Sequence, residues 1–319
     1  MSELAIRSLR MDDLDRVSGI ENRIGGHPRK GFLEKRFSAA TRSPDGFIAC
    51  GAMDHGNLAG YAFARIQTGE FGSRDAAAVL DVIGVDSGAQ RHGIGKALMR
   101  EIEARLSEKK VGVLKTQVNW SDHPMVMFFS SAGFHLSSHQ VIERDTSPLE
   151  EKLSEPAQGQ RRGSEDPNDL SRDRFLIRSL EEADLSEVVR IDHSLTGRDR
   201  SAYFSAKIQE MLNESGIRIS LVAEEDGVLT GYVMASVDFG EFGKVDKAAV
   251  IDAIGVHSAY AGSGIGHALL SQLLLNLSTL QVEYVRTQVS PEDFELNRFL
   301  HACGFHQSQR LVLTKPLTH

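Results

Sequence analysis

The sequence predicts an α/β protein with two tandem domains, each a mixed and mostly antiparallel sheet flanked by helices. Three observations support this fold class. The second half of the chain repeats the first, each half orders strand-like and helix-like segments in the same way, and a polar segment separates the halves. A length of 319 residues suits two domains, since one domain usually has about 100–200 residues.

The repeat consists of short matching segments at a constant spacing of 171 positions. These segments begin at Ile6 and Ile177, Gly69 and Gly240, Asp81 and Asp252, Gly93 and Gly264, Thr116 and Thr287, and Gly133 and Gly304. A period this long is a whole domain rather than the unit of a solenoid. We therefore expect the same complete set of elements in residues 1–147 and in residues 174–319.

Residues 148–173, between the two copies, are expected to form a flexible polar linker. The segment contains Pro156, Pro167 and an Arg-Arg-Gly run at 161–163, with few apolar residues and no periodicity. A segment of this composition cannot bury a core. We therefore expect the two halves to fold independently.

Within one copy, the spacing of apolar residues predicts each element in turn. Alternation predicts a first strand, and Asp12 or Asp13 then caps an amphipathic helix. An Asp-His-Gly-Asn turn at 54–57 joins two strands into a hairpin. A nearly continuous apolar run indicates a buried central strand, and an apolar stripe after the glycine loop indicates a helix. The expected strands are 4–10, 46–53, 58–68, 76–85, 111–118 and one or two after 134; the expected helices are 12–24, 29–41, 93–109 and 122–132.

Composition and charge narrow the function class. The net charge of −8 argues against a dedicated nucleic-acid binder, which usually presents a basic face. Cys50 and Cys303 have neither metal-site nor disulfide spacing, which favours a reducing cytoplasm. The N-terminus lacks signal-peptide order, and the most apolar helix, 269–280, is too short and polar to span a bilayer. We expect a cytoplasmic protein with no metal and no nucleic-acid or membrane partner, and an oligomer is compatible with the sequence.

The glycine-rich loop between the central strand and the next helix constrains function most. Backbone N–H groups at a helix start have no intrahelical partner, and the helix dipole adds partial positive charge. Glycines let a phosphate reach those donors. Side chains at Gln90, Arg91, His92 and Lys96 add further donors. The loop therefore predicts an anionic ligand that carries phosphate.

Two common nucleotide motifs do not fit this loop. Gly88 and Gly93 have the spacing of a mononucleotide P-loop, but Ile94 stands where that motif requires lysine. Leu98 replaces the third small residue of the dinucleotide motif, and no acidic residue ends a following parallel strand at the required distance. We therefore expect a different phosphate-bearing ligand.

The loop resembles that of the GNAT superfamily of N-acyltransferases. The family signature is Gln or Arg, two residues, Gly, one residue, and Gly or Ala, between a central strand and a helix. The sequence Gln-Arg-His-Gly-Ile-Gly at 90–95 matches it. The resemblance extends to the flanking hairpin and to the helix that ends in Phe-Phe-Ser-Ser-Ala-Gly-Phe at 128–134, and it covers nearly all of both domains.

This resemblance implies an acyl-coenzyme A co-substrate, with acetyl-CoA the leading candidate. The pantetheine arm would lie in a gap beside the central strand, pairing with the backbone of Val85, and the thioester would sit near the middle of that strand. An acceptor amine would attack it directly. The residues expected to hold the coenzyme are Ile83, Gly84, Val85, Gln90, Arg91, His92, Gly93, Ile94, Gly95 and Lys96 in the first copy, and Val256, Gly262, Gly264, Ile265 and Gly266 in the second.

The sequence departs from the family at two positions in each copy. The tyrosine that usually protonates the leaving thiolate is replaced by Phe129 in the first copy and Leu300 in the second. A frequent asparagine of the family is replaced by Asp122 and Asp293. Thiolate protonation would then use water or another group, unless one or both domains are not catalysts.

Two pairs of acids are candidates for the base that deprotonates the acceptor. Asp81 and Asp252 interrupt apolar central strands, where a carboxylate is costly unless it is satisfied. The alternative is a structural aspartate that bonds to the backbone at a strand bulge. Glu70 and Glu241 lie in paired Gly-Glu-Phe-Gly segments, where the alternative is a solvated glutamate in a hairpin loop.

Two functions remain open. One is transfer of an acyl group to a primary amine of a protein or a small molecule. The other is a degenerate pair of domains that binds acyl-CoA as a regulatory or interaction protein. We expect the first copy to bind the coenzyme more tightly, because Ala-Gly-Ser at 261–263 replaces Gln-Arg-His at 90–92 and His267 replaces Lys96.

Overall fold

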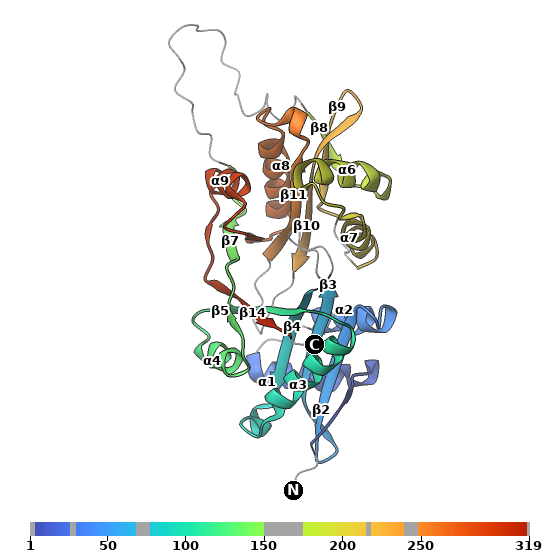
Figure 1. Ribbon diagram of the computed structural model, residues 1–319, viewed down its shortest axis with the longest axis vertical. Coiled ribbons are helices and arrows are strands. Elements are labelled where there is room, and N and C mark those ends of the chain that lie inside the picture. The colour runs from blue at the N-terminus through green and yellow to red at the C-terminus, as the bar shows by residue number, and fades with distance from the viewer. Residues whose placement is uncertain are drawn as a thin grey trace.

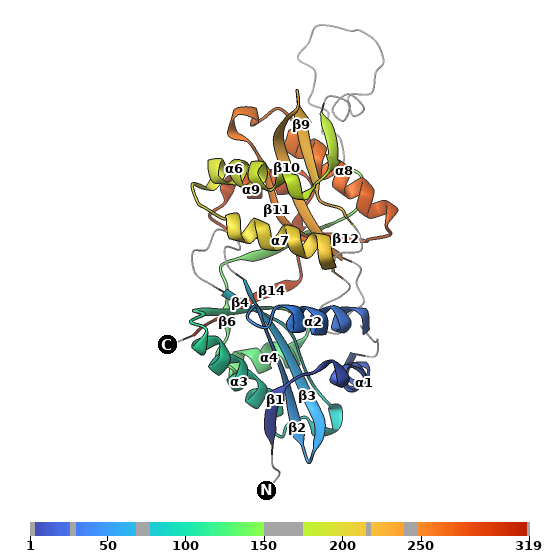
Figure 2. The same cartoon turned by 90° about the vertical axis from the view of Figure 1, so that its right-hand side faces the viewer.

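The computed structural model describes residues 4–25, 30–67, 77–149, 175–214, 218–238 and 248–317. Across these residues the chain forms two seven-stranded sheets, each flanked by helices (Figures 1 and 2). The lower body of Figure 1 is called lobe 1 and the upper body lobe 2; each is named for the half of the chain that supplies most of it. The predicted fold class is confirmed.

Lobe 1 has the strand order β1-β2-β3-β4-β5-β14-β6, in which only β4 and β5 are parallel neighbours. Its elements are β1 (Ala5–Ser8), η1 (Met11–Asp13), α1 (Leu14–Gly25), α2 (Lys30–Arg42), β2 (Phe47–Asp54), β3 (Asn57–Gln67), β4 (Ala77–Val85), η3 (Ser87–Ala89), α3 (Ile94–Glu108), β5 (Val113–Asn119), α4 (His123–Ser131), β6 (His135–Leu136) and β14 (Arg310–Pro316).

Lobe 2 repeats this arrangement with the order β13-β7-β12-β11-β10-β9-β8. Its elements are β8 (Leu176–Ser179), η4 (Glu182–Asp184), α6 (Leu185–Thr196), α7 (Ser201–Glu214), β9 (Leu221–Glu225), β10 (Val228–Asp238), β11 (Ala248–Val256), η5 (Ser258–Tyr260), α8 (Ile265–Thr279), β12 (Tyr284–Val289), α9 (Phe294–Ala302), β13 (His306–Gln307) and β7 (Gln140–Asp145).

The helices follow from the apolar pattern of the sequence. In α3, four residues spaced by four positions form one buried stripe against the sheet, and burial of each contributes about 1.5–3 kcal/mol. These residues are Ile94, Leu98, Ile102 and Leu106. The opposite face of the sheet packs against α1 and α2, so each lobe has one core on either side of its sheet.

The predicted hairpin between β2 and β3 is present. His55 and Gly56 both have positive φ, 49° and 77°, as the tight turn of a two-residue hairpin requires. Asp226 and Gly227 repeat the turn in lobe 2 with φ of 53° and 77°. This agreement shows that the duplication preserved local backbone geometry as well as element order.

The two halves exchange one strand each, which the sequence did not lead us to expect. The last strand of the first half, β7, pairs with β12 in lobe 2, while the last strand of the chain, β14, pairs with β5 in lobe 1. Figure 1 shows the green β7 entering the upper lobe and the red β14 entering the lower one. Each half thus holds a full set of elements, but neither half closes its own sheet, because each sheet contains one strand of the other half.

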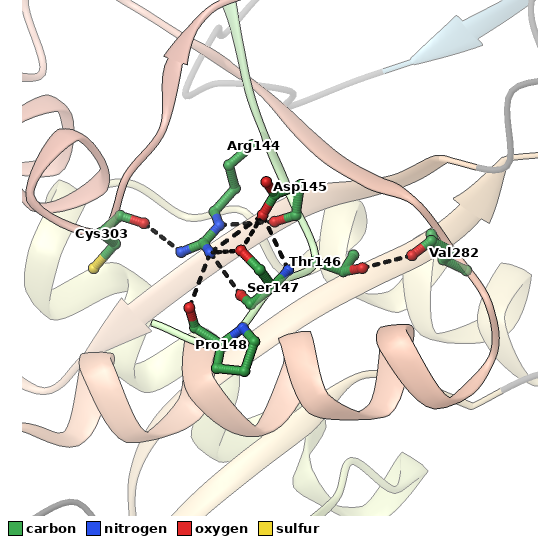
Figure 3. Close-up of polar contacts among 7 residues, drawn as sticks. All are labelled: Arg144, Asp145, Thr146, Ser147, Pro148, Val282 and Cys303. Atoms are coloured by element: carbon green, nitrogen blue, oxygen red, sulfur yellow. Dashed lines mark hydrogen bonds and ion pairs between the residues drawn. The ribbon is translucent and has the colours of Figure 1, made fainter. Parts of the chain in front are cut away.

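Polar contacts fix the exchanged strand β7 in lobe 2 (Figure 3). The guanidinium of Arg144 donates to the Cys303 carbonyl at 2.5 Å and to the Ser147 carbonyl at 2.6 Å. Thr146 Oγ1 donates to the Val282 carbonyl at 2.7 Å. In lobe 1, Lys315 of β14 occupies the position related to Arg144 and binds Glu103 of α3 at 2.5 Å.

The exchange continues into the cores. Ile142 and Leu149, from the first half, are buried in the core of lobe 2, whereas Leu313, from the second half, is buried in the core of lobe 1. Leu149 belongs to the predicted linker, but it packs as a core residue, 8% exposed. Linker residues 150–173 lie outside the described residues.

The exchanged strands bring the two lobes together around an approximate two-fold axis. Gln117 Nε2 donates to Gln288 Oε1 at 3.4 Å, and these two residues are 171 positions apart, so each is the other's counterpart. They lie on β5 and β12, which are the strands that receive β14 and β7. The chain is thus folded like a strand-exchanged dimer whose two subunits are covalently joined.

Candidate functional site

A gap opens between the two parallel strands of each sheet. In lobe 1, β4 pairs with β5 only over Ala77–Val79, and within the described residues the rest of β4, to Val85, has no strand partner on that edge. In lobe 2, β11 pairs with β12 only over Ala248–Val250. Each gap therefore exposes the edge of a central strand, whose backbone can pair with an extended ligand.

A threonine marks the closed end of each gap. Thr116 Oγ1 donates to the Leu80 carbonyl at 3.1 Å, and Thr287 Oγ1 donates to the Ile251 carbonyl at 3.0 Å. Both threonines are buried. Beyond this point each central strand continues to its glycine loop, and no strand pairs with this edge in the ranges that the structure describes.

Asp81 and Asp252 are the extra residues of β-bulges at the midpoints of β4 and β11. The pairing register shifts between Phe63/Ala64 in lobe 1, which leaves Asp81 without a partner on β3. The same shift between Met234/Ala235 leaves Asp252 unmatched in lobe 2. A bulge bends its strand and turns a side chain out of the regular alternation. Both aspartates thus lie at strand bulges, as the structural alternative requires, but the partners of their carboxylates among the described residues are side chains rather than the backbone.

The carboxylate of Asp81 is held by two guanidinium groups. Arg65 Nε donates to Oδ1 at 2.8 Å, and Arg36 Nε lies 3.1 Å from Oδ2, with the Asp81 side chain only 5% exposed. The Arg36 guanidinium also stacks over the ring of Phe32, 5.0 Å from its centroid. Because two cations neutralise this carboxylate, its contacts are those of a structural ion pair. Its use as the catalytic base stays a prediction.

Asp252 has weaker cationic surroundings than Asp81. Lys207 Nζ donates to its Oδ1 at 3.0 Å, and Ser236 Oγ donates to its Oδ2 at 3.2 Å. Lys207 and Ser236 occupy the positions related to Arg36 and Arg65 by the 171-residue repeat. Lobe 2 thus keeps the bulged acid, but replaces two guanidinium groups with one amine and one hydroxyl.

The glycine loop of lobe 1 has the geometry of an anion site. Gly93 precedes α3 with φ 82°, and in the part of the chain described here no side chain caps the first turn of that helix. Gly95 permits close packing of this turn, because a Cβ there would lie 3.0 Å from the Phe128 ring. Gln90, Arg91, His92 and Lys96 are all exposed around this point. The expected phosphate donors are therefore gathered at one helix start.

The predicted residues below the loop form its apolar support. Ile83 and Val85 pack against the core of lobe 1, and Ile94 is buried in it. Gly84 lies against the ring of Tyr61, where a Cβ would come within 2.6 Å of Cε1. The Val85 carbonyl accepts from Gln90 Nε2 at 3.3 Å, and its second lone pair leaves room for one further donor.

Two arginines from α1 fix the beginning of the lobe 1 loop. Arg16 and Arg23 contact Asp86 Oδ2 at 3.1 and 2.7 Å, and Asp86 in turn accepts from the Gly88 N–H. The hydrogen bond from Arg23 lowers the pKa of Asp86. These arginines also add positive charge beside the predicted phosphate site.

Lobe 2 keeps the loop backbone but changes its side chains. Gly264 precedes α8 with φ 95°, and Gly262 has φ 79° where Arg91 of lobe 1 has φ 65°. His257 replaces Asp86 and accepts from the Ala259 N–H. The remaining predicted residues, Val256, Ile265 and Gly266, occupy positions equivalent to those of Val85, Ile94 and Gly95.

The positions of the missing tyrosine are buried. Phe129 is 0% exposed and packs edge-on against Phe134, while Leu300 is 1% exposed. Asp122 caps α4 by accepting from the Met125 N–H at 3.2 Å, which is a structural role. The predicted acids Glu70 and Glu241 lie outside the described residues.

A buried tyrosine–carboxylate pair in each lobe was not predicted from the sequence. Tyr61 donates to Glu21 and Tyr232 donates to Asp192, both at 3.2 Å. Burial raises the pKa of Tyr232 well above its usual range. The 171-residue repeat could have revealed these pairs, because Tyr61 and Tyr232 are counterparts, as are Glu21 and Asp192.

None of the helices in the described ranges has the length and hydropathy that a bilayer crossing requires.

Comparisons with known proteins agree with this geometry. A model of the acetyltransferase (GNAT) family matches residues 10–134 and 185–305. The ribosomal protein bS18-alanine N-acetyltransferase of Escherichia coli strain K12 is 28% identical over 130 residues, which cover 41% of this chain and 80% of that enzyme.

Solved structures share the fold of the whole chain. A tandem GNAT protein from the clavulanic acid biosynthesis pathway superposes with a TM-score of 0.63 over 99% of both chains, at 17% identity. The glucosamine N-acetyltransferase region of a fungal GH3 beta-N-acetylglucosaminidase gives a TM-score of 0.67 at 15% identity. That match covers 98% of this chain and 38% of the longer fungal protein. With the family matched in both halves and the same gap and glycine loop in both lobes, this chain belongs to the GNAT acetyltransferase family.

Proposed function

We propose that the protein is an N-acyltransferase that moves an acetyl or other acyl group from acyl-CoA to a primary amine. The acceptor amine attacks the thioester directly, and it belongs to a protein lysine, a protein N-terminus or a small molecule. The observation that carries the proposal is the strand gap that ends at an uncapped helix start, present in both lobes. The gap suits an extended pantetheine arm, and the helix start suits a pyrophosphate.

Lobe 1 is proposed as the tighter coenzyme site. Its loop adds Arg91 and Lys96 to the backbone donors, and Arg16 and Arg23 stand behind Asp86. Charge-assisted contacts to phosphate contribute about 1.5–3 kcal/mol each when they are well placed. Since Phe129 and Leu300 cannot donate a proton, water or another group protonates the leaving thiolate. A cytoplasmic location is part of the same proposal, and both Cys50 and Cys303 are buried.

The alternative function is a regulatory acyl-CoA-binding protein. It is favoured by the cationic clamp on Asp81 and by the buried side chains at the tyrosine positions. Under this alternative both gaps bind acyl-CoA, but no acyl group reaches an external amine.

The two functions differ in one measurement. The full chain is incubated with acetyl-CoA and a panel of amines and lysine peptides, and free thiol release is followed together with the mass of each acceptor. Thiol release with an acetylated acceptor supports the transferase. Tight binding of acetyl-CoA without any acetylated acceptor supports the regulatory protein.

A charge-reversal pair tests the position of the coenzyme. Arg91→Glu combined with Lys96→Glu is expected to weaken acetyl-CoA binding at least about tenfold. Arg100→Glu is the matched control, because Arg100 is exposed on the same helix but lies one turn beyond the loop. Equal loss of affinity in both variants would contradict the proposed position.

A further inference from the structure

We propose that lobe 2 acylates itself on Lys207, whose ε-amine takes the acyl group from an acyl-CoA bound in the gap between β11 and β12. This inference rests on the proposed function, because it uses the same position of the coenzyme. It adds an internal acceptor, a lysine of the chain itself, to the external amines considered above.

The position of the Lys207 amine carries the proposal. Its Nζ lies 3.0 Å from Asp252 Oδ1, and Asp252 is the bulged residue at the midpoint of β11. The pairing of β11 with β12 stops two residues earlier, at Val250, and Thr287 bridges the next residue, Ile251. The amine is therefore held beside β11, the strand along which the thioester is proposed to lie, at the level where the pairing of β11 with β12 has stopped.

The surroundings of Lys207 differ from those of a surface lysine. Its side chain is 10% exposed, and that of Asp252 is 14% exposed. Ser236 Oγ donates to the second carboxylate oxygen of Asp252, and the Tyr203 hydroxyl donates to its backbone carbonyl. The pair is thus oriented from several sides and shielded from bulk water, which favours reaction at one defined amine.

Lobe 1 provides the internal comparison. Arg36 occupies the position equivalent to Lys207, and its Nε lies 3.1 Å from the bulged carboxylate of Asp81. A guanidinium keeps its proton in proteins and is not a nucleophile. The two lobes therefore place a cation at the same point of the same fold, but only lobe 2 places an amine that can accept an acyl group.

The step balances without any further reagent. The ammonium of Lys207 gives a proton to the carboxylate of Asp252, and the free amine attacks the thioester carbonyl. A C–N bond forms and the C–S bond breaks while the attacking nitrogen loses its second proton, which leaves a neutral amide on Lys207. This second proton passes through water to the coenzyme A thiolate and gives free coenzyme A, and Asp252 returns the first proton to solvent, so one proton is released overall. The product has lost the positive charge that paired with Asp252.

The test uses the full chain with acetyl-CoA as the only acyl donor. Peptide mass spectrometry is expected to find one acetyl group on Lys207, acquired at least about tenfold faster than on Lys30, a lysine whose side chain is 56% exposed. Absence of acetylation at Lys207 while acetyl-CoA binding is measured on the same sample would overturn the proposal. Equal rates at Lys207 and Lys30 would also overturn it, because they indicate uncatalysed chemistry.

Three variants sharpen the test. Lys207→Arg keeps a cation at Asp252, as in lobe 1, and is expected to melt like the parent protein and to acquire no acetyl group there. Asp252→Asn is expected to slow acetylation of Lys207 by about 10²–10⁴-fold, the usual contribution of a general base. Arg36→Lys is expected to create a second acetylated site in lobe 1. An unmodified Lys at position 36 in a variant whose lobe 1 still binds acetyl-CoA would contradict the geometric argument.

Failure of this inference is distinguishable from failure of the proposed function. A protein that binds acetyl-CoA and acetylates external amines without modification of Lys207 retains the proposed function and loses only the internal acceptor. A protein that binds no acetyl-CoA in either gap loses both.

Discussion

Lobe 1 and lobe 2 share a backbone but differ in the charges placed on it. Both have the strand gap, the bulged aspartate and a helix start preceded by a glycine with positive φ. Lobe 1 surrounds these features with guanidinium groups, whereas lobe 2 has Lys207 and Ser236 at the bulge and Gly262 in the loop. The duplication therefore preserved the geometry that could hold a coenzyme and changed the chemistry beside it.

The largest expected effect comes from removal of one exchanged strand, which should unfold lobe 1 and leave lobe 2 folded. A chain that ends after Gln309 lacks β14, and with it the buried residues Val312 and Leu313 of lobe 1. Each contributes about 1.5–3 kcal/mol by burial, and the backbone pairing with β5 is lost as well. We expect lobe 1 to lose its cooperative melting transition while lobe 2 keeps its own in differential scanning calorimetry. Two unchanged transitions would show that lobe 1 closes its sheet without β14.

Cleavage within residues 148–173 is the matched control for that truncation, since it cuts the chain and removes no strand. The two fragments are expected to remain together in gel filtration, because each lobe contains a strand of the other fragment. Separation of the fragments without unfolding would instead support independent folding of the halves.

Next in size is the loss of a bulged carboxylate. Asp81→Asn removes the charge of a buried carboxylate that two partly buried arginines contact, and breaking a buried pair typically costs about 3–5 kcal/mol. Asp252→Asn removes the partner of one lysine and is expected to cost less. Chemical denaturation of both variants gives this order, and an equal cost would contradict it. If Asp81 is also the base, turnover measured well below the melting temperature falls by about 10²–10⁴-fold with little change in acetyl-CoA affinity.

A smaller effect is expected when one loop residue of lobe 1 is replaced by the residue at the equivalent position of lobe 2. Arg91→Gly is expected to weaken acetyl-CoA binding by lobe 1 about tenfold, since it removes one phosphate contact. The same change is expected to raise stability by up to about 1 kcal/mol, because Arg91 has φ 65°, which glycine adopts more readily. Calorimetric titration and thermal melting measure the two effects separately. A loss of both acetyl-CoA affinity and thermal stability in Arg91→Gly would contradict a role of Arg91 in ligand binding.

The smallest effect is a pH dependence confined to lobe 1. Arg23 lowers the pKa of Asp86, so this ion pair stabilises the fold above the unfolded value of about 3.9 and loses its effect as pH falls through the lower folded value. Because the arginines are exposed, the contribution is about 1 kcal/mol or less. Asp86→Asn is therefore expected to melt earlier than the parent at pH 7 and equally at strongly acid pH. A constant difference across this range would exclude the ion pair as the cause.

Local features of this fold could be predicted from the sequence. The apolar stripe of α3 and the turn at His55 and Gly56 depend on residues close together in the chain, and both occur where the pattern places them. The glycine loop was equally visible, because the helix start it precedes is a local feature. The repeat supported these predictions further, because both copies of the sequence predict the same elements in the same order.

Partners across space could not be predicted in the same way. The alternation in β7 and β14 indicates a strand, but it does not say which sheet receives that strand, and the two strands have equivalent local surroundings. The sequence also placed Asp81 in an apolar strand without showing that Arg36 and Arg65 reach it from α2 and β3. Burial could be inferred from the pattern, but the charges that satisfy the buried group could not.

The strand exchange has a consequence for how the protein is made. On the ribosome the first half is complete long before β14 exists, so the edge of β5 is open and β7 is the only equivalent strand at hand. A nascent chain that places β7 beside β5 forms a closed single lobe with nearly the same local pairing. Birth order thus favours a closed intermediate that must reopen when β14 emerges, and the final arrangement depends on Arg310–Pro316, a strand made long after β5.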